Sequence, residues 1–220
     1  MENGMRREFA GGPAAQAGFT LVELLVVIGL LGVLAVVLIP QISGARTRGE
    51  EVETLARISH LSQACDGYKR AKSRGYYPPD DFVSPDPEDG VKCKADEING
   101  GIESAMIFLH QRAEGLQVFD DKEDWLGNTD EDSNSGDIPL LQRRAKVEVL
   151  DAWGTPLAYF TNQSYGKDQK IKRADGQIVK ASAWKNPNSN GYFAPRGYQI
   201  ISAGVDREFN TADDLTHPSR

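Results

Sequence analysis

The chain has 220 residues, enough for one domain with an appendage or for two small domains. Its 25 basic residues face 32 acidic ones, and the net charge of −7 argues against a protein built to neutralise a nucleic-acid backbone. The two cysteines, Cys65 and Cys93, provide neither a disulfide framework nor a four-cysteine zinc site. The three histidines, His60, His110 and His217, lie too far apart to indicate a metal site or a catalytic triad.

An apolar segment near the N-terminus is the first predicted element. In residues 19–39 only Thr20 and Glu23 are neither apolar nor glycine. A helix of this length spans roughly 30 Å, the thickness of the hydrocarbon core of a bilayer. We therefore expect one transmembrane helix over residues 19–40, followed by a globular domain over residues 41–220.

The residues around the apolar segment distinguish it from an ordinary secretory signal. A cleaved secretory signal has a shorter apolar run with small residues after it. Here the run is longer, and the small pair Ala17-Gly18 precedes it. Ser43-Gly44-Ala45 does follow the run, so a cleaved signal remains the alternative.

Four residues within the segment are unusual for a plain anchor. A carboxylate inside hydrocarbon is costly and is by default functional, so Glu23 is a candidate functional residue, with a headgroup contact as the alternative. Gly29, Gly32 and Pro40 weaken the helix, because glycine disfavours helix and proline removes a hydrogen bond. The glycines are equally consistent with close packing of helices.

The helix is expected to continue beyond Pro40 to about residue 72. Apolar residues recur every three to four positions, which predicts one buried helix face, and charged residues occupy the other faces. Arg74-Gly75 and Tyr77-Pro78 then predict its end. The predicted buried face consists of Val52, Leu55, Ile58, Leu61, Cys65 and Tyr68.

The middle of the chain is predicted to hold a loop over residues 84–94 and a second amphipathic helix over residues 98–113. Between residues 120 and 137, eight carboxylates stand against the single Lys122, which is typical of a solvated loop. Its spacing of Asp130, Asp132 and Asn134 matches part of a calcium-binding EF-hand loop. Position 135 lacks the required glycine and position 141 the required glutamate, so the EF-hand interpretation fails.

Short β-rich segments follow, at residues 147–150, 157–161, 177–181 and 198–202. The turn signals Asp175-Gly176 and Asn190-Gly191 separate them. We therefore expect an α+β fold, in which a long N-terminal helix packs on a small antiparallel sheet.

Gly18 is followed by FTLVELL and a hydrophobic helix, and this motif closely resembles the start of type IV prepilins and type II secretion prepseudopilins. The resemblance implies that residues 1–18 are a leader. A prepilin peptidase would cut between Gly18 and Phe19 and methylate the new amine. It also implies that Glu23 sets subunit register by pairing with the amine of a neighbouring subunit, and that the stretch from Gly29 to Pro40 loses helical structure on assembly.

Two later motifs resemble the major pseudopilins of type II secretion. DAWGTPLAY at residues 151–159 resembles their Asp-Pro-Trp-Gly-x-Pro-x-x-Tyr segment, with Ala152 in place of proline. SAGVD at residues 202–206, followed by an acidic pair, resembles their C-terminal calcium loop, although residues 207–210 replace a glycine-rich stretch. The resemblance implies calcium bound by Asp206, Asp213 and Asp214, to which we add Asn210 as a further candidate ligand.

The function implied is that of a structural subunit and not of an enzyme. The subunit would lie in the bacterial inner membrane with its C-terminal domain in the periplasm, and would polymerise with copies of itself and with other pseudopilins. A membrane assembly platform and its ATPase would be its partners, and no nucleic acid is expected. The alternative is a type IV pilin for motility, adhesion or DNA uptake. Cys65 and Cys93 are left with two interpretations, a disulfide or a buried thiol at Cys65.

Overall fold

The computed structural model describes residues 19–71, 75–85, 93, 95, 97–110, 119, 122–138 and 143–219. The chain divides into two compact units, Met1–Ala45 and Arg46–Arg220, and each is considered by itself. The predicted leader, including Gly18, lies outside the described residues.

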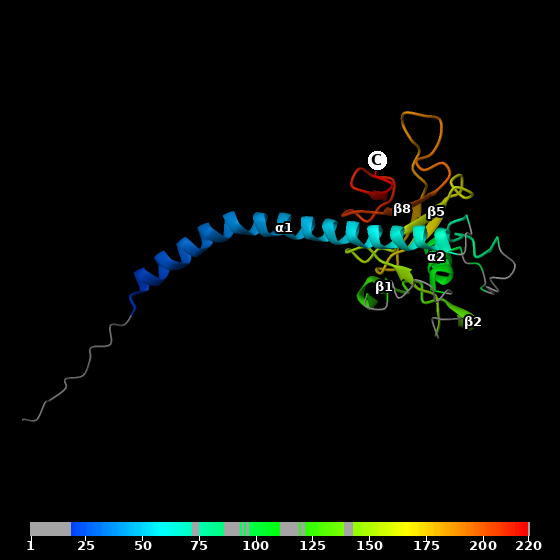
Figure 1. The fold of residues 1–220 in the computed structure, drawn as a ribbon. Coiled ribbons are helices and arrows are strands. Elements are labelled where there is room, and N and C mark those ends of the chain that lie inside the picture. The colour runs from blue at the N-terminus through cyan, green and yellow to red at the C-terminus, as the bar shows by residue number, and fades with distance from the viewer. Residues whose placement is uncertain are drawn as a thin grey trace, which may run out of the picture. The chain divides into compact units, whose positions relative to one another are not determined.

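Helix α1, Leu21–Arg70, confirms the predicted long helix (Figure 1). Within the first unit it continues without interruption through Gly29, Gly32 and Pro40. The large apolar side chains described there are exposed, and a β-carbon added at either glycine would meet no atom within 4 Å. No helix in the described part of the chain reaches the length and hydropathy needed to cross a membrane.

The part of α1 in the second unit packs on the globular domain with a face that differs from the predicted one at its start. Four of the six predicted core residues, from Ile58 onward, are buried. Val52 and Leu55 are exposed, with 68% and 46% of their surface accessible. Thr54 and Arg57 are buried in their place, because both bind the backbone of residues 150–152.

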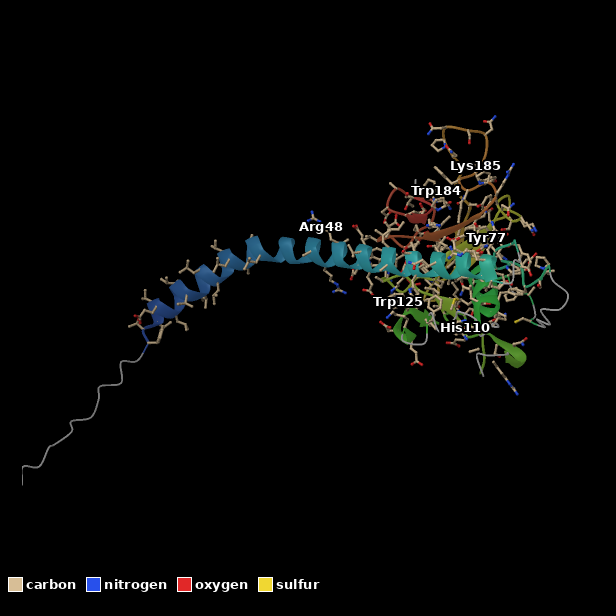
Figure 2. All side chains as sticks on the ribbon, viewed as in Figure 1. Arg48, Tyr77, His110, Trp125, Trp184 and Lys185 are labelled. Carbon is tan, nitrogen blue, oxygen red and sulfur yellow. The ribbon has the colours of Figure 1, made fainter. Side chains whose placement is uncertain are left out.

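Helix α2, Gly100–His110, lies at the centre of the domain. All of its residues from Gly100 to Leu109 are buried, so it is enclosed on every side and not only on one face. Its apolar side chains share one core with α1 and with the strands around Tyr159 and Ile200. Figure 2 shows the dense packing of side chains in this unit, in which Trp125 borders the core.

In the described part of the chain the strand pairs are antiparallel, as predicted, but they form four small sheets instead of one. The largest has the order β5-β8-β9 and the other sheets pair β6 with β7, β1 with β4 and β2 with β3. The strands and one short helix are β1 Leu126–Gly127, β2 Ser133–Ile138, β3 Arg143–Ala145, β4 Glu148–Val149, β5 Ala158–Thr161, β6 Gln169–Lys172, β7 Ile178–Ala181, β8 Tyr198–Ser202, β9 Leu215–His217 and the 3-10 helix η3 Glu123–Trp125.

The predicted α+β fold is confirmed, and β4, β5, β7 and β8 correspond to the four predicted strands. The prediction of a solvated loop over residues 120–137 was wrong for the described part of this segment. That part forms η3, β1 and β2, and Asp130 and Asp132 are partly buried in it. Cys65 is a buried thiol, as the second of its two interpretations expected.

Candidate functional site

The start of α1 is closed by a reciprocal pair, Thr20 and Glu23. The backbone N–H and the hydroxyl of Thr20 donate to Oε2 of Glu23 at 2.9 and 2.8 Å. The N–H of Glu23 donates back to Oγ1 of Thr20 at 3.2 Å. This arrangement is a capping box, which satisfies helix donors that otherwise lack a partner. The carboxylate predicted to set subunit register is therefore already engaged at the end of its own helix.

The sequence contained the signal for this cap, because a threonine stands three residues before a glutamate at the start of an apolar run. Interpreting Glu23 only as a buried charge missed it. Among the described residues, the hydrogen bonds that Glu23 accepts fall on Oε2. Oε1 is thus the oxygen of Glu23 that a cation could contact while the cap stays intact.

Asp151 is the centre of the second motif. One oxygen of its buried carboxylate accepts the N–H groups of Trp153 and Thr155 at 3.0 and 2.8 Å. These bonds close a tight turn in which Gly154 has a φ of +81°, a conformation that other residues adopt only with strain. Burial raises the pKa of Asp151 to about 6, although the donors from Thr155 and Trp153 oppose the shift.

The same turn fastens the second half of α1 to the domain. Arg57 donates from Nη1 to the carbonyls of Leu150 and Asp151 at 2.9 and 3.2 Å. The indole N–H of Trp153 donates to Glu50 at 2.9 Å. The DAWGTP segment therefore serves to position the helix within the domain.

Asp151 also connects the second motif to the third. Its other carboxylate oxygen accepts the hydroxyl of Ser202 at 2.8 Å, and Ser202 begins the C-terminal motif. Strands β5 and β8 lie in register beside this bond, with Tyr159 opposite Ile200. Two segments about fifty residues apart in the sequence thus form one structural unit, although spacing alone carried no sign of it.

The C-terminal loop holds the four residues predicted to bind calcium, and its own donors engage them. Asp213 accepts the N–H of Asp206 at 3.1 Å, and Asp214 accepts the N–H of Asn210 at 2.9 Å. The indole N–H of Trp184 (Figure 2) also donates to Asp214, at 3.1 Å. The side-chain amide of Asn210 donates to a backbone carbonyl at 3.4 Å.

The loop is tightly folded at Gly204. A β-carbon at this position would lie 2.5 Å from the carbonyl oxygen of Asp213, and the φ of Gly204 is +68°. Burial raises the pKa of Asp214, which is partly offset by the N–H groups that it accepts.

The donor set of this loop, carboxylate and carbonyl oxygens, has the chemistry that calcium prefers. Each of the three carboxylates accepts hydrogen bonds from donors inside the loop. Within the described ranges, the group of three carboxylates that could hold a metal lies elsewhere, at Glu103, Asp130 and Glu148. A calcium ion at the C-terminal loop would therefore have to replace some of the hydrogen bonds inside the loop.

The motif FTLVELL at residues 19–25 stands at the start of the long helix α1, and an α+β domain follows. This combination defines the class of prepilin-like subunits. Residues 13–39 match the family model described as the prokaryotic N-terminal methylation motif. The chain is 39% identical to type II secretion system core protein G of Escherichia coli strain K12 over 208 residues, covering 92% of this chain and 90% of that protein. The chain therefore belongs to the type II secretion system core protein G family, a family of pseudopilins.

Two other relatives carry the same name. The protein of Klebsiella michiganensis is 27% identical over 132 residues, which cover 54% of this chain and 91% of that protein. The protein of Aeromonas hydrophila is 38% identical over 59 residues, which cover 27% of this chain and 41% of that protein. Comparison with solved structures gives no significant match.

Proposed function

We propose that this chain is a structural subunit of a type II secretion pseudopilus, and that it acts by polymerising in the cell envelope instead of by catalysis. The observation that carries the proposal is the alignment with the Escherichia coli core protein G along nearly the whole chain. The match to the methylation motif supports the same role.

Maturation is the first step of the proposed function. A prepilin peptidase cuts between Gly18 and Phe19 and methylates the amine of Phe19. The cut retains the apolar half of α1 on the product. The cut also creates a cation, the amine of Phe19, four residues before Glu23. Oε1 of Glu23 can pair with the corresponding amine of a neighbouring subunit.

The apolar half of α1 has two successive environments in this proposal. Its exposed apolar side chains are held first by the inner membrane, with the domain in the periplasm, and then by the other subunits in the filament core. Gly29, Gly32 and Pro40 ease the transfer, because each lowers the stability of a helix. An assembly platform with its ATPase drives the transfer, and other pseudopilins complete the filament.

A structural calcium ion at the C-terminal loop is a further part of the proposal. Asp206, Asp213 and Asp214 supply carboxylate oxygens, and Asn210 is a candidate fourth ligand. What supports the site is the donor chemistry and the close fold at Gly204. When bound, the ion would supply charge neutralisation to three carboxylates within one short loop.

Deletion of the gene tests the proposed function. The culture medium of the deletion strain should lose a set of exported proteins while twitching motility and DNA uptake persist. Complementation with the wild-type gene should restore the lost proteins. An unchanged set of exported proteins together with lost motility or DNA uptake would contradict the proposal and favour a type IV pilin.

A further inference from the structure

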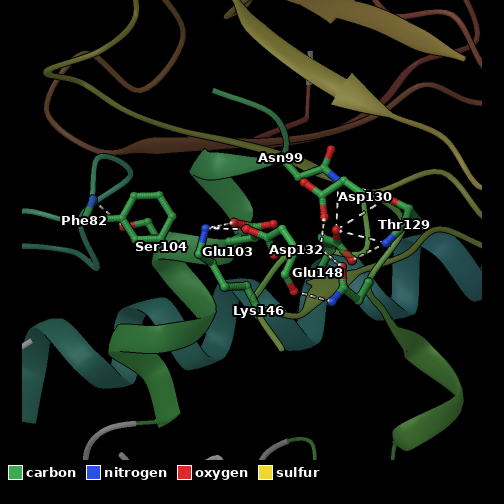
Figure 3. A network of polar contacts seen from close by, with 10 residues as sticks. Phe82, Asn99, Glu103, Ser104, Thr129, Asp130, Asp132, Lys146 and Glu148 are labelled. Atoms are coloured by element: carbon green, nitrogen blue, oxygen red, sulfur yellow. Dashed lines mark hydrogen bonds and ion pairs between the residues drawn. The ribbon is translucent and has the colours of Figure 1, made fainter. Parts of the chain in front are cut away.

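Three carboxylates from separate parts of the chain meet inside the domain (Figure 3). Glu103 comes from α2, Asp130 from the acidic segment and Glu148 from β4. One oxygen of each lies within 4.8 Å of an oxygen of the other two. Glu103 and Glu148 are fully buried and Asp130 is half-buried. The place is far in sequence from the N-terminal motif and from the C-terminal loop.

The buried carboxylate of Glu103 lacks hydrogen-bond donors among the described residues and shares its nearest cation. Neither of its carboxylate oxygens, both fully buried, accepts a hydrogen bond from any described residue. The nearest cation is the ammonium group of Lys146, which lies 3.5 Å from Oε2. That ammonium group also forms an ion pair with Asp132, so it is shared between two carboxylates. A buried carboxylate without donors is costly, which points to a missing ligand.

The carboxylate of Glu148 is held in place by the surrounding structure. Oε1 of Glu148 accepts the side-chain amide of Asn99 at 2.8 Å and the N–H of Thr129 at 3.2 Å. The backbone carbonyl of Lys172 accepts the hydroxyl of Thr129 at 2.6 Å, which fixes Thr129 in turn. Glu148 therefore presents its carboxylate in a defined position before any ligand arrives.

Carboxylates outnumber ammonium groups among the described residues of this cluster. Among the described residues, the ammonium group of Lys146 lies beside the carboxylates of Glu103 and Asp132, and the carboxylates of Asp130 and Glu148 lie next to that of Glu103. Burial, together with repulsion from Asp132, raises the pKa of Glu103 to about 9. Burial also raises the pKa of Glu148 to about 7.

We infer that Glu103, Asp130 and Glu148 form an internal binding site for a divalent cation of the size of calcium. The ligands are all oxygen atoms, which suit a hard cation. Atoms at the corners of a triangle with sides of at most 4.8 Å lie within about 2.8 Å of its centre, close to the calcium–oxygen distance of roughly 2.3 to 2.6 Å. Magnesium, at about 2.1 Å, would require the site to contract.

A cation at this site would give the acidic segment that contains Asp130 and Asp132 a structural role. Its turn positions Asp130 against α2, with the amide of Asn128 donating to the carbonyl of Asp132 at 2.8 Å. A bound cation would join this segment to α2 and β4. The inference does not depend on the proposed role in secretion.

Calcium binding to the purified full chain in detergent tests the site. Titration calorimetry with calcium alone should be carried out in an Asp213→Asn background, which removes a ligand of the C-terminal loop. The test variant is Glu103→Gln, which keeps the size of the side chain and removes its charge. The control is Glu97→Gln, a similar change at an exposed carboxylate that pairs with Lys170 on the surface.

The expected result is the loss of one equivalent of bound calcium in Glu103→Gln and no loss in Glu97→Gln. Millimolar calcium should raise the melting temperature of the Asp213→Asn protein by several degrees. It should leave the melting temperature unchanged when Glu103→Gln is added to Asp213→Asn.

Equal calcium stoichiometry in the parent and in Glu103→Gln would overturn the inference and would mean that protons or water alone balance the cluster. If Glu103→Gln does not fold, Asp130→Asn decides by the same comparison, because Asp130 is only half-buried. A purely structural role for these residues would change the melting temperature equally with calcium and with chelator, and that result would also contradict the site.

Discussion

Asp151 shows how one buried carboxylate can join three parts of a domain. It accepts the N–H groups of its own turn and the hydroxyl of Ser202, while its carbonyl accepts the guanidinium of Arg57. Removal of such a residue would leave several buried donors without partners, each costing about 1 to 3 kcal/mol. Asparagine is the substitution that preserves these contacts, since its oxygen can accept the two N–H groups and its amide can donate to Ser202.

The pH dependence of stability should reveal the ionisation of Asp151. Its pKa in the folded state is about 6, above the ordinary 3.8, so the folded state holds the proton more tightly than the unfolded state. Stability should therefore fall as the pH rises through this interval. The guanidinium of Arg57 is a charged group that faces Asp151 and opposes the rise of its pKa. Relative to Asp151→Asn, we expect the free energy of unfolding of the wild type to fall by at most about 3 kcal/mol.

Urea denaturation of both proteins at several pH values between 4 and 6 measures this difference. Asp124→Asn, the same change at an exposed carboxylate, serves as the control and should run parallel to the wild type. Parallel curves for wild type and Asp151→Asn would show that Asp151 does not hold its proton in the folded state.

Single residues in this chain are predictable from the sequence when their partners are nearby. The capping box of Thr20 and Glu23 is a local pattern of four residues. The bond between Asp151 and Ser202 and the meeting of Glu103 with Glu148 depend on chain topology, for which spacing in the sequence carries no signal. The N-terminal candidates could be named from the sequence, whereas the cluster of Glu103, Asp130 and Glu148 became visible only in the structure.

Among the elements, the C-terminal loop permits a direct test of calcium. Calcium that binds only the folded state stabilises it by about 2.7 kcal/mol at a hundred times its dissociation constant, which corresponds to several degrees of melting temperature. The full chain in a Glu103→Gln background should therefore melt several degrees higher in millimolar calcium than in chelator. Asp206→Asn should abolish this difference, whereas Asp168→Asn should preserve it.

Magnesium should substitute poorly, because it requires a smaller and more regular set of ligands. Identical melting curves with calcium and with chelator in the Glu103→Gln background would mean that the hydrogen bonds inside the loop hold it without an ion.

Elements with a strong local pattern were predictable, and those defined by their neighbours were not. The periodic spacing of Ile58, Leu61 and Cys65 was sufficient to predict the second half of α1. Strand β2 contains serine, asparagine, glycine and aspartate, which have low strand propensity, so its pairing with β3 could not be read from composition. The predicted helix face failed at Val52 and Leu55 because polar contacts of Thr54 and Arg57 decide the packing there.

For the molecule as a whole, the exposed apolar surface of α1 is the feature that indicates contact with other subunits. The described apolar side chains of the first half of α1 are exposed, and so are Val52 and Leu55 further along the helix. Contiguous apolar exposure of this kind marks interaction with membrane or protein. Assembly into a filament would cover this surface with copies of the same helix.

Glu23→Ala should separate assembly from insertion. Pairing of Glu23 with the amine of a neighbour at 4 Å is worth about 4 kcal/mol at an effective dielectric of 20, of which desolvation offsets part. The variant should accumulate in the membrane as well as the wild type, while filament yield on overexpression falls at least tenfold, as counted by electron microscopy. Glu51→Ala, on the same helix, is the control and should assemble. Normal filaments from Glu23→Ala would show that this carboxylate does not set the register.

The proposed function requires that this chain is cut after Gly18 and that the mature chain forms the filament. The most direct measurement is the intact mass of the main subunit in pseudopili isolated from cells that overproduce the secretion system. We expect this chain without its first 18 residues, which leaves 202 of the 220, with a methyl group on the amine of Phe19. A subunit that begins at Met1 or near Arg46, or filaments that lack this chain, would contradict it.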